Sequence, residues 1–224
     1  MAGAGGGGPL TIAERVAGAV AEVRAYCPPP EIRVFTPPCK PVVVGSCILP
    51  CPAGGSFGRP DIGVVQLVQN GVLLAGAPAG ATGGSGTQEC ASNAFSIEAA
   101  GGAIKGFKQS LQRLTFAGPT KGTPSPVKTG ETLTIQWNPT PGYVVASPGY
   151  YTESEGAFCI ADGMAGEMKI PWEAIQTFSP PGGSGAAIPF KTRAADAVFL
   201  SREQGEVFVL FQGTGTMQGI PIAK

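Results

Sequence analysis

The sequence alternates short hydrophobic runs with clusters of turn residues along most of its length. The clearest run is ETLTIQW (131–137), where Leu133, Ile135 and Trp137 fall on one side and polar residues fall between them. This period of two predicts a strand with one buried and one exposed face.

Two hairpins are predicted from turn signals between hydrophobic runs. Asn70-Gly71 lies in the middle of GVVQLVQNGVLLAG (63–76), and both residues tolerate the positive φ angles of a tight hairpin turn. In DAVFLSREQGEVFVLFQG (196–213), strands are expected at Ala197–Leu200 and Glu206–Phe211, around a polar turn.

The remaining runs complete a mostly β pattern. Turn signals recur every 8 to 12 residues, which is typical of an antiparallel β-sandwich, immunoglobulin-like or jelly-roll-like. Trp137, followed by Cys159, is similar to the immunoglobulin core pattern, but the cysteine that should precede the tryptophan is displaced, with Cys90 nearest. The other expected elements are strands at 94–97, 104–107, 111–116, 143–145 and 157–160, and a short helix or turn at 170–178.

One N-terminal helix is predicted over residues 12–26. Thr11 and Glu14 form a capping-box signature, and the prolines after Cys27 end the helix. The helix either docks on its own domain or forms an arm that packs on a neighbouring subunit. The residues expected to mediate that assembly share helical spacing and are Ile12, Val16, Val20 and Val23.

Residues 28–61 are rich in proline and predict an extended connector. Short strands are possible at 31–35 and 41–44, but the prolines argue against a central place in a sheet. The expected organisation is a flexible Gly-rich N-terminus at 1–10, a helical arm at 11–27, the extended Pro/Cys-rich connector at 28–61, and a β-sandwich domain with an extended C-terminal tail at 62–224.

The composition indicates a surface with few charges, and therefore with little electrostatic repulsion between protein molecules. Charged residues make up 13% of the 224 residues and the net charge is zero, which favours association. The chain has no excess of basic residues, so nucleic-acid binding is not expected, and it has no apolar run long enough to predict a membrane span. The N-terminus does not resemble a secretory signal.

Histidine is absent, which removes the usual general base and every Ser-His or Cys-His arrangement. The G-x-S-x-G match at 54–58 has no histidine partner and is expected by chance in a chain with 35 glycines. The acidic residues of the second half are interpreted as surface acids rather than a catalytic pair: Glu153, Glu155, Asp162, Glu167 and Glu173. No enzyme activity, cofactor or metal is expected.

Four of the six cysteines lie within residues 27–51. The eleven-residue gap between Cys27 and Cys39 and the lack of histidine disfavour zinc. Lys40 beside Cys39 gives little support to a catalytic thiol, and buried free thiols remain an alternative. Disulfides are favoured, with at least one inside 27–51 and a possible Cys90–Cys159 bridge, so reduction should loosen 27–51 and leave the chain from Ile62 folded. The candidate cysteines are Cys27, Cys39, Cys47, Cys51, Cys90 and Cys159.

The favoured function is a non-enzymatic structural protein of a large assembly. A virion component of the tailed-phage type is expected, such as a capsid decoration (cement) protein or a tail protein, in contact with copies of itself and with other structural subunits of the particle. The alternative is a secreted or cell-surface β-sandwich that binds carbohydrate or protein. Its platform would consist of exposed aromatic residues: Tyr143, Tyr150, Tyr151 and Trp172.

Overall fold

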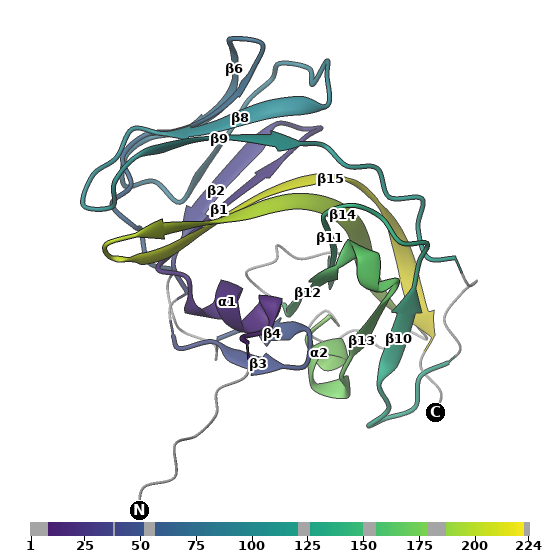
Figure 1. Ribbon diagram of the computed structural model, residues 1–224. Helices are drawn as coiled ribbons and strands as arrows, with labels where there is room; N and C mark the ends of the chain where they lie inside the picture. Colours follow the sequence, from purple (N-terminus) through teal and green to yellow (C-terminus); the bar gives the residue numbers. More distant parts are fainter. Residues whose placement is uncertain are drawn as a thin grey trace, which may run out of the picture.

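The computed structural model describes residues 9–37, 39–51, 57–120, 126–149, 156–178 and 187–221 (Figure 1). These residues form a nine-stranded, a four-stranded and a two-stranded sheet in a sandwich-like arrangement, with few helices. The predicted mostly β class is therefore confirmed. Within the described ranges, no helix has the length and apolar character needed to span a membrane.

The nine-stranded sheet has the order β3-β4-β12-β11-β14-β15-β1-β2-β7. Its neighbours pair antiparallel, except β1 and β15, which are parallel. Its strands are β1 (Ala21–Tyr26), β2 (Glu31–Phe35), β3 (Val42–Val44), β4 (Cys47–Leu49), β7 (Gly83–Ser85), β11 (Tyr143–Pro148), β12 (Phe158–Asp162), β14 (Ala187–Arg202) and β15 (Gly205–Pro221).

Two smaller sheets cover one face of the large one. The four-stranded sheet has the order β6-β5-β8-β9, with β5 (Val65–Gln69), β6 (Val72–Ala77), β8 (Ala94–Ala99) and β9 (Phe107–Gln112). The two-stranded sheet pairs β10 (Leu133–Gln136) with β13 (Glu167–Ile170). Asn70 and Gly71 have φ angles of 52° and 78°, so the predicted hairpin turn is confirmed.

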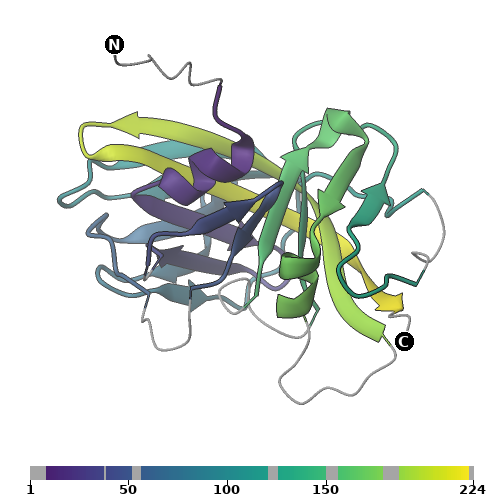
Figure 2. The same cartoon turned by 90° about the horizontal axis from the view of Figure 1, so that it is seen from below.

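The long β14–β15 hairpin joins the two halves of the molecule. Near its turn, Val207, Val209 and Phe211 pack under the four-stranded sheet. Near its open end, Phe190 and Ile220 pack with β10, β13 and the helix α2 (Trp172–Thr177). Figures 1 and 2 show this hairpin passing from one half to the other.

The other face of the large sheet is concave. On this face the Arg24 guanidinium of β1 lies 3.9 Å from the ring centre of Phe158 on β12. These strands are four positions apart in the sheet, or about 19 Å if the sheet were flat. The contact therefore requires the sheet to curl, and Figure 1 shows it arching around α1 (Ile12–Gly18), with its own strands β3, β4 and β12 on the far side of that helix.

The predicted helix over 12–26 is wrong beyond Gly18. Val20 precedes β1 and Val23 lies within it, so neither belongs to a helical face. Strand pairing with β15 and β2 satisfies the backbone of residues 21–26, and alternate residues Ala21, Val23 and Ala25 enter the core. Long-range strand pairing thus decides the structure of a segment whose local pattern fits a helix as well as a strand.

The short helix that does form docks on its own sheet. The Thr11–Glu14 capping box is present, and Ala13 and Val16 are buried in a cluster that includes Phe158 and Phe208. Among the described residues, this favours the interpretation of a docked helix over that of an arm reaching a neighbouring subunit.

The predicted connector and C-terminal tail are also corrected. β2 lies inside the nine-stranded sheet, between β1 and β7, and β4 pairs with β12. Pro30 and Pro37 flank β2 rather than interrupt it, so the ladder bonds of that strand remain possible. The last described residues are not a tail, because β15 continues in the sheet to Pro221.

Candidate functional site

A cavity of about 460 Å³ opens at one end of the concave face. Tyr26 and Arg33 line one side of it, from β1 and β2, and Lys191 and Arg193 line the other side, from β14. Gly213 and Gly215 of β15 belong to the lining between them. A side chain at either glycine would meet neighbouring atoms, the Leu114 carbonyl at Gly213 and the Thr192 carbonyl at Gly215, so both positions require glycine for close packing.

The cavity is cationic although the whole chain is neutral. Among the described residues, its charged lining consists of Lys191, Arg193, Arg33 and one carboxylate, that of Glu31. Arg33 donates from Nε to Glu31 Oε1 at 2.7 Å, so this pair is already neutralised. No ion pair recorded among the described residues involves Lys191 or Arg193, which leaves both positive charges facing the cavity.

A buried amide positions the aromatic and cationic groups of this cavity. Gln212 is fully buried, and its Oε1 accepts from Arg193 Nη1 at 3.4 Å. The Gln212 Nε2 donates to the Tyr26 hydroxyl at 3.4 Å, and the Arg193 guanidinium lies 5.3 Å from the centre of the Tyr26 ring. These three side chains therefore form one hydrogen-bonded group, in which buried Gln212 positions both Tyr26 and Arg193.

A second cavity of about 420 Å³ adjoins the first along β2. Glu31 and Arg33 line both cavities, and the second adds Phe35 and Phe57, whose rings meet edge to face at 5.4 Å. We call the two cavities together the groove. The remaining residues of the second cavity are Arg24, Thr82, Gly83, Gly84 and Ser85.

A buried ion pair lies beneath the groove on β1. Arg24 donates from Nη2 and Nε to Glu22 Oε2, at 2.6 and 3.0 Å, and the two side chains are only 4% and 3% exposed. The guanidinium also lies over the rings of Phe35 and Phe158. Through these two ring contacts, the Arg24 side chain connects β1 with β2 and, across the concave face, with β12.

All six cysteines form disulfides, so the prediction of disulfides is confirmed. The Cys39–Cys51 bond is the expected one within residues 27–51. The suggested Cys90–Cys159 bond is wrong, because the real partners are Cys27–Cys90 and Cys47–Cys159. The two cysteines of the suggested bond belong to different halves of the molecule, and each has a nearer partner.

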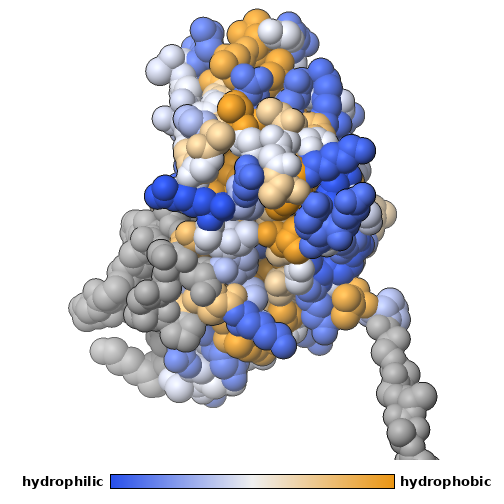
Figure 3. Space-filling model, turned by 90° about the vertical axis from the view of Figure 1, so that its left-hand side faces the viewer, coloured by the Kyte–Doolittle hydropathy of each residue, from blue (hydrophilic) through white to orange (hydrophobic). Residues whose placement is uncertain are grey.

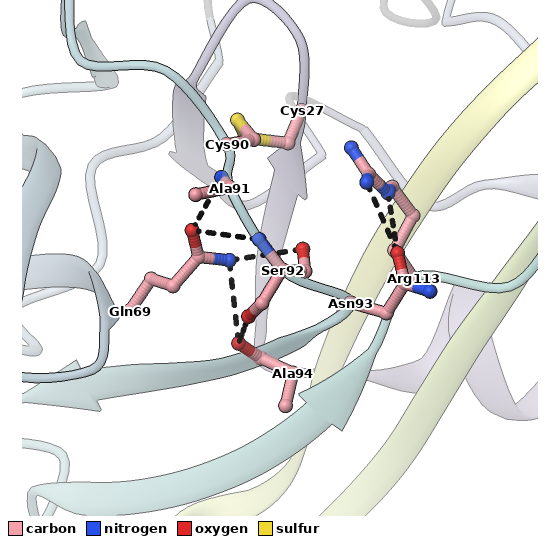
Figure 4. Close-up of a disulfide and its surroundings, with 8 residues drawn as sticks. All are labelled: Cys27, Gln69, Cys90, Ala91, Ser92, Asn93, Ala94 and Arg113. Carbon is pink, nitrogen blue, oxygen red and sulfur yellow. Dashed lines mark hydrogen bonds between the residues drawn. A yellow bond between two sulfur atoms is a disulfide. The ribbon is translucent and has the colours of Figure 1, made fainter.

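The Cys27–Cys90 bond lies at the rim of the groove, since Cys27 lines the first cavity (Figure 4). Beside it, buried Gln69 accepts from the backbone N–H of Ala91 at 2.7 Å and donates to the Ser92 carbonyl at 3.0 Å. This network holds the segment that follows Cys90, so the rim is braced against the four-stranded sheet.

The aromatic residues predicted as a binding platform do not come together. Tyr143 packs on the concave side near α1, whereas Trp172 packs against the core of the β10–β13 half. Tyr150 and Tyr151 lie outside the described residues. Burial, and secondarily Asp162, raises the pKa of the Tyr143 phenol.

The acids and motifs set aside at the sequence level form no alternative centre in the described ranges. Asp162 accepts the backbone N–H of Met164 and caps a short 3-10 helix (Gly163–Ala165). Among those residues, no cluster of His, Cys, Asp or Glu could hold a metal ion. Glu153, Glu155 and Ser56 of the G-x-S-x-G match lie outside the described residues.

Sequence reasoning missed the groove residues, although a signal for them exists. Arg24 with Tyr26, Glu31 with Arg33, and Lys191 with Arg193 each stand two positions apart. That spacing puts each pair on one face of a strand, and here each pair faces the concave side. The pattern marks polar strand faces, but only the topology brings β14 close to β1 and β2.

Comparisons with known proteins assign no family. No family profile matches the chain, and no curated protein matches it. Among solved structures, the crystal structure of chicken CNTN1 FN1–FN3 domains aligns at 9% sequence identity with a TM-score of 0.21, over 88% of this chain and 66% of that chain. This similarity is too low to carry an argument about fold or function.

Proposed function

We propose that the protein is a non-enzymatic binding module of an oxidising, extracytoplasmic compartment, and that its groove holds an anionic ligand. The observation that carries this proposal is the pair of cations, Lys191 and Arg193, which line an open cavity and form no ion pair with a carboxylate of the described residues. A concave site lined by one sign of charge concentrates its field and attracts ligands of the opposite sign.

The disulfides support the proposed compartment. Three bonds account for all six cysteines, and such bonds persist in secreted, periplasmic or surface proteins. The groove chemistry supports binding rather than catalysis, because Glu31 is the one carboxylate among the described lining residues and is paired with Arg33. General base catalysis needs a group free to accept a proton.

Thermal unfolding in the presence of small anions tests the proposal. Glucuronate and sulfate should raise the melting temperature of the wild type more than glucose does, since ligands that bind the folded state stabilise it. The Lys191→Gln/Arg193→Gln double variant should lose that rise. Lys169→Gln, an exposed cation on β13 outside the groove, is the matched control and should keep it. Equal responses of all three proteins would refute the proposal.

A second candidate is the structural subunit of a large particle, such as a tailed-phage virion. Edge strand β6 carries Val72 and Leu73, which are 51% and 50% exposed, and edge strand β3 carries Val42, which is 58% exposed. Figure 3 shows apolar residues gathered at the end of the molecule that the four-stranded sheet forms. Open sheet edges with exposed apolar side chains are templates for pairing with another chain.

Sedimentation tests this second candidate. The wild type should form oligomers at micromolar concentration, and Val42→Lys combined with Leu73→Lys should return it to a monomer. Val64→Lys, at an exposed apolar position before β5, is the control and should leave the assembly intact. A wild type that stays monomeric throughout would remove the support for this candidate.

A further inference from the structure

The two cavities of the groove form one continuous site, because the Glu31 and Arg33 side chains line both of them. We propose that this site binds a linear acidic polysaccharide, with successive sugar units in the first and second cavities. The proposal rests on the anion-binding function above and specifies its ligand.

The size of the groove favours a chain over a single small ligand. The two cavities measure about 460 and 420 Å³, and each falls in the range that holds one small molecule. They meet at the Arg33–Glu31 pair, where a negative group of the ligand can replace or share the carboxylate partner of Arg33. A ligand that fills both cavities must therefore extend across β2.

The lining chemistry matches sugar units that carry carboxylate or sulfate groups. The first cavity offers Lys191 and Arg193 for anions, and Ser147 and Thr214 as hydroxyl-bearing residues. The second cavity offers Arg33 and two further hydroxyl residues, Thr82 and Ser85. Phe57, whose ring rests edge to face against buried Phe35, supplies apolar ring surface on which the C–H face of a sugar ring can pack.

An extended acidic peptide fits the floor of the groove less well. Peptides that bind along a sheet usually add a strand to a free edge. The floor strands have no such edge, since β1 pairs with β15 and β2, and β2 pairs in turn with β7. Recognition must then come from side chains alone, which suits the hydroxyl and acid groups of a polysaccharide.

Calorimetric titration with galacturonic acid, its dimer and its tetramer tests the proposal. The tetramer should bind about tenfold or more tightly than the monomer, because the second cavity acts on a ligand already held in the first. A sulfated tetrasaccharide distinguishes sulfate from carboxylate as the preferred acid. Cellotetraose, which is neutral, should not bind measurably.

Two variants locate the sugar units. Phe57→Ala should weaken binding of the tetrasaccharide and leave binding of the monosaccharide unchanged, whereas Arg33→Gln should weaken binding of both. The control Lys169→Gln should change neither affinity. Circular dichroism at the titration temperature verifies that each variant is folded. Equal affinity for monomer and tetramer would overturn the chain-binding proposal while leaving the anion site intact. The proposal of a polysaccharide ligand would be overturned if tetraglutamate bound as tightly as the acidic tetrasaccharide or more tightly, or if no acidic saccharide bound.

Discussion

At the scale of single residues, the most unusual feature is an ion pair in the interior of a charge-poor protein. Glu22 and Arg24 are both buried, and their equivalents on the adjacent strand, Glu31 and Arg33, repeat the pairing at about one-third exposure. Arg24 lies directly opposite Arg33 in the strand register. The chain therefore contains a buried pair and a solvated pair of the same spacing.

This duplication permits a controlled test of the buried pair. Arg24→Met should lower the free energy of unfolding by about 3–5 kcal/mol, because it leaves the Glu22 carboxylate buried without its main partner. Arg33→Met should cost no more than about 1 kcal/mol, since water solvates Glu31 when its partner is removed. Urea denaturation of both variants measures the difference.

A double variant shows whether the loss of stability comes from the buried carboxylate left without its partner. Glu22→Met combined with Arg24→Met should be more stable than Arg24→Met alone, because no uncompensated carboxylate remains in the core. If the double variant loses the sum of both single effects, the residues act independently and the pair does not stabilise the curl of the sheet.

At the scale of elements, α1 depends on a charged cap. The Thr11 backbone N–H donates to Glu14 Oε2 at 2.7 Å, and the Glu14 backbone N–H donates to Thr11 Oγ1 at 3.2 Å. The hydrogen bonds from the Thr11 backbone, and then from its side chain, hold the pKa of Glu14 below its usual 4.5. The carboxylate form is therefore favoured in the folded state.

The sign of this shift predicts a pH dependence. The stabilisation is fully present above pH 4.5 and is lost as the pH falls through the lowered pKa of Glu14. The melting temperature of the wild type should exceed that of Glu14→Gln at pH 7, and the two should converge on acidification. Glu203→Gln, in the exposed β14–β15 turn, is the control. A gap that is independent of pH would show that the charge of Glu14 has no role.

The elements also show what local sequence can and cannot predict. The Asn70-Gly71 hairpin and the strand at Leu133 follow from signals within a few residues, and both are present. The helix predicted over 20–26 is wrong, because Val20 and Val23 fit a helical face as well as a strand. Its strand form depends on pairing with β15, whose paired residues lie 186 positions further along the chain.

The groove illustrates the same limit for function. Each of its polar pairs has the spacing of one strand face, so their outward orientation could be predicted. Their convergence could not, since Arg33 and Lys191 come from distant parts of the sequence. They meet only because the large sheet curls and because the order of its strands places β1 and β2 beside the β14–β15 hairpin.

At the scale of the whole molecule, the disulfides connect segments that the sequence predicts to be separate regions. Cys27–Cys90 joins the end of β1 to the segment before β8, and Cys47–Cys159 joins β4 to β12. The first bond links the predicted helical arm to the β-sandwich, and the second links the predicted connector to it. Reduction should therefore loosen both halves of the molecule rather than residues 27–51 alone.

The length of the loop that each disulfide closes predicts the order of their contributions to stability. The bonds span 112, 63 and 12 residues for Cys47–Cys159, Cys27–Cys90 and Cys39–Cys51. The chain-entropy relation gives about 5, 4 and 3 kcal/mol of stabilisation, respectively, because longer loops restrict the unfolded chain more. Guanidinium unfolding of the three paired Cys→Ala variants should follow that order.

Hydrogen exchange on the same three variants separates global from local effects. Loss of Cys47–Cys159 should increase exchange in β12 and β4, and, through the shared large sheet, in β11 and β14 as well. Loss of Cys39–Cys51 should affect mainly the β3–β4 hairpin, which that bond encloses. If all three variants exchange faster only within residues 27–51, that segment unfolds separately from the rest of the chain, and the large sheet does not unfold as one cooperative unit.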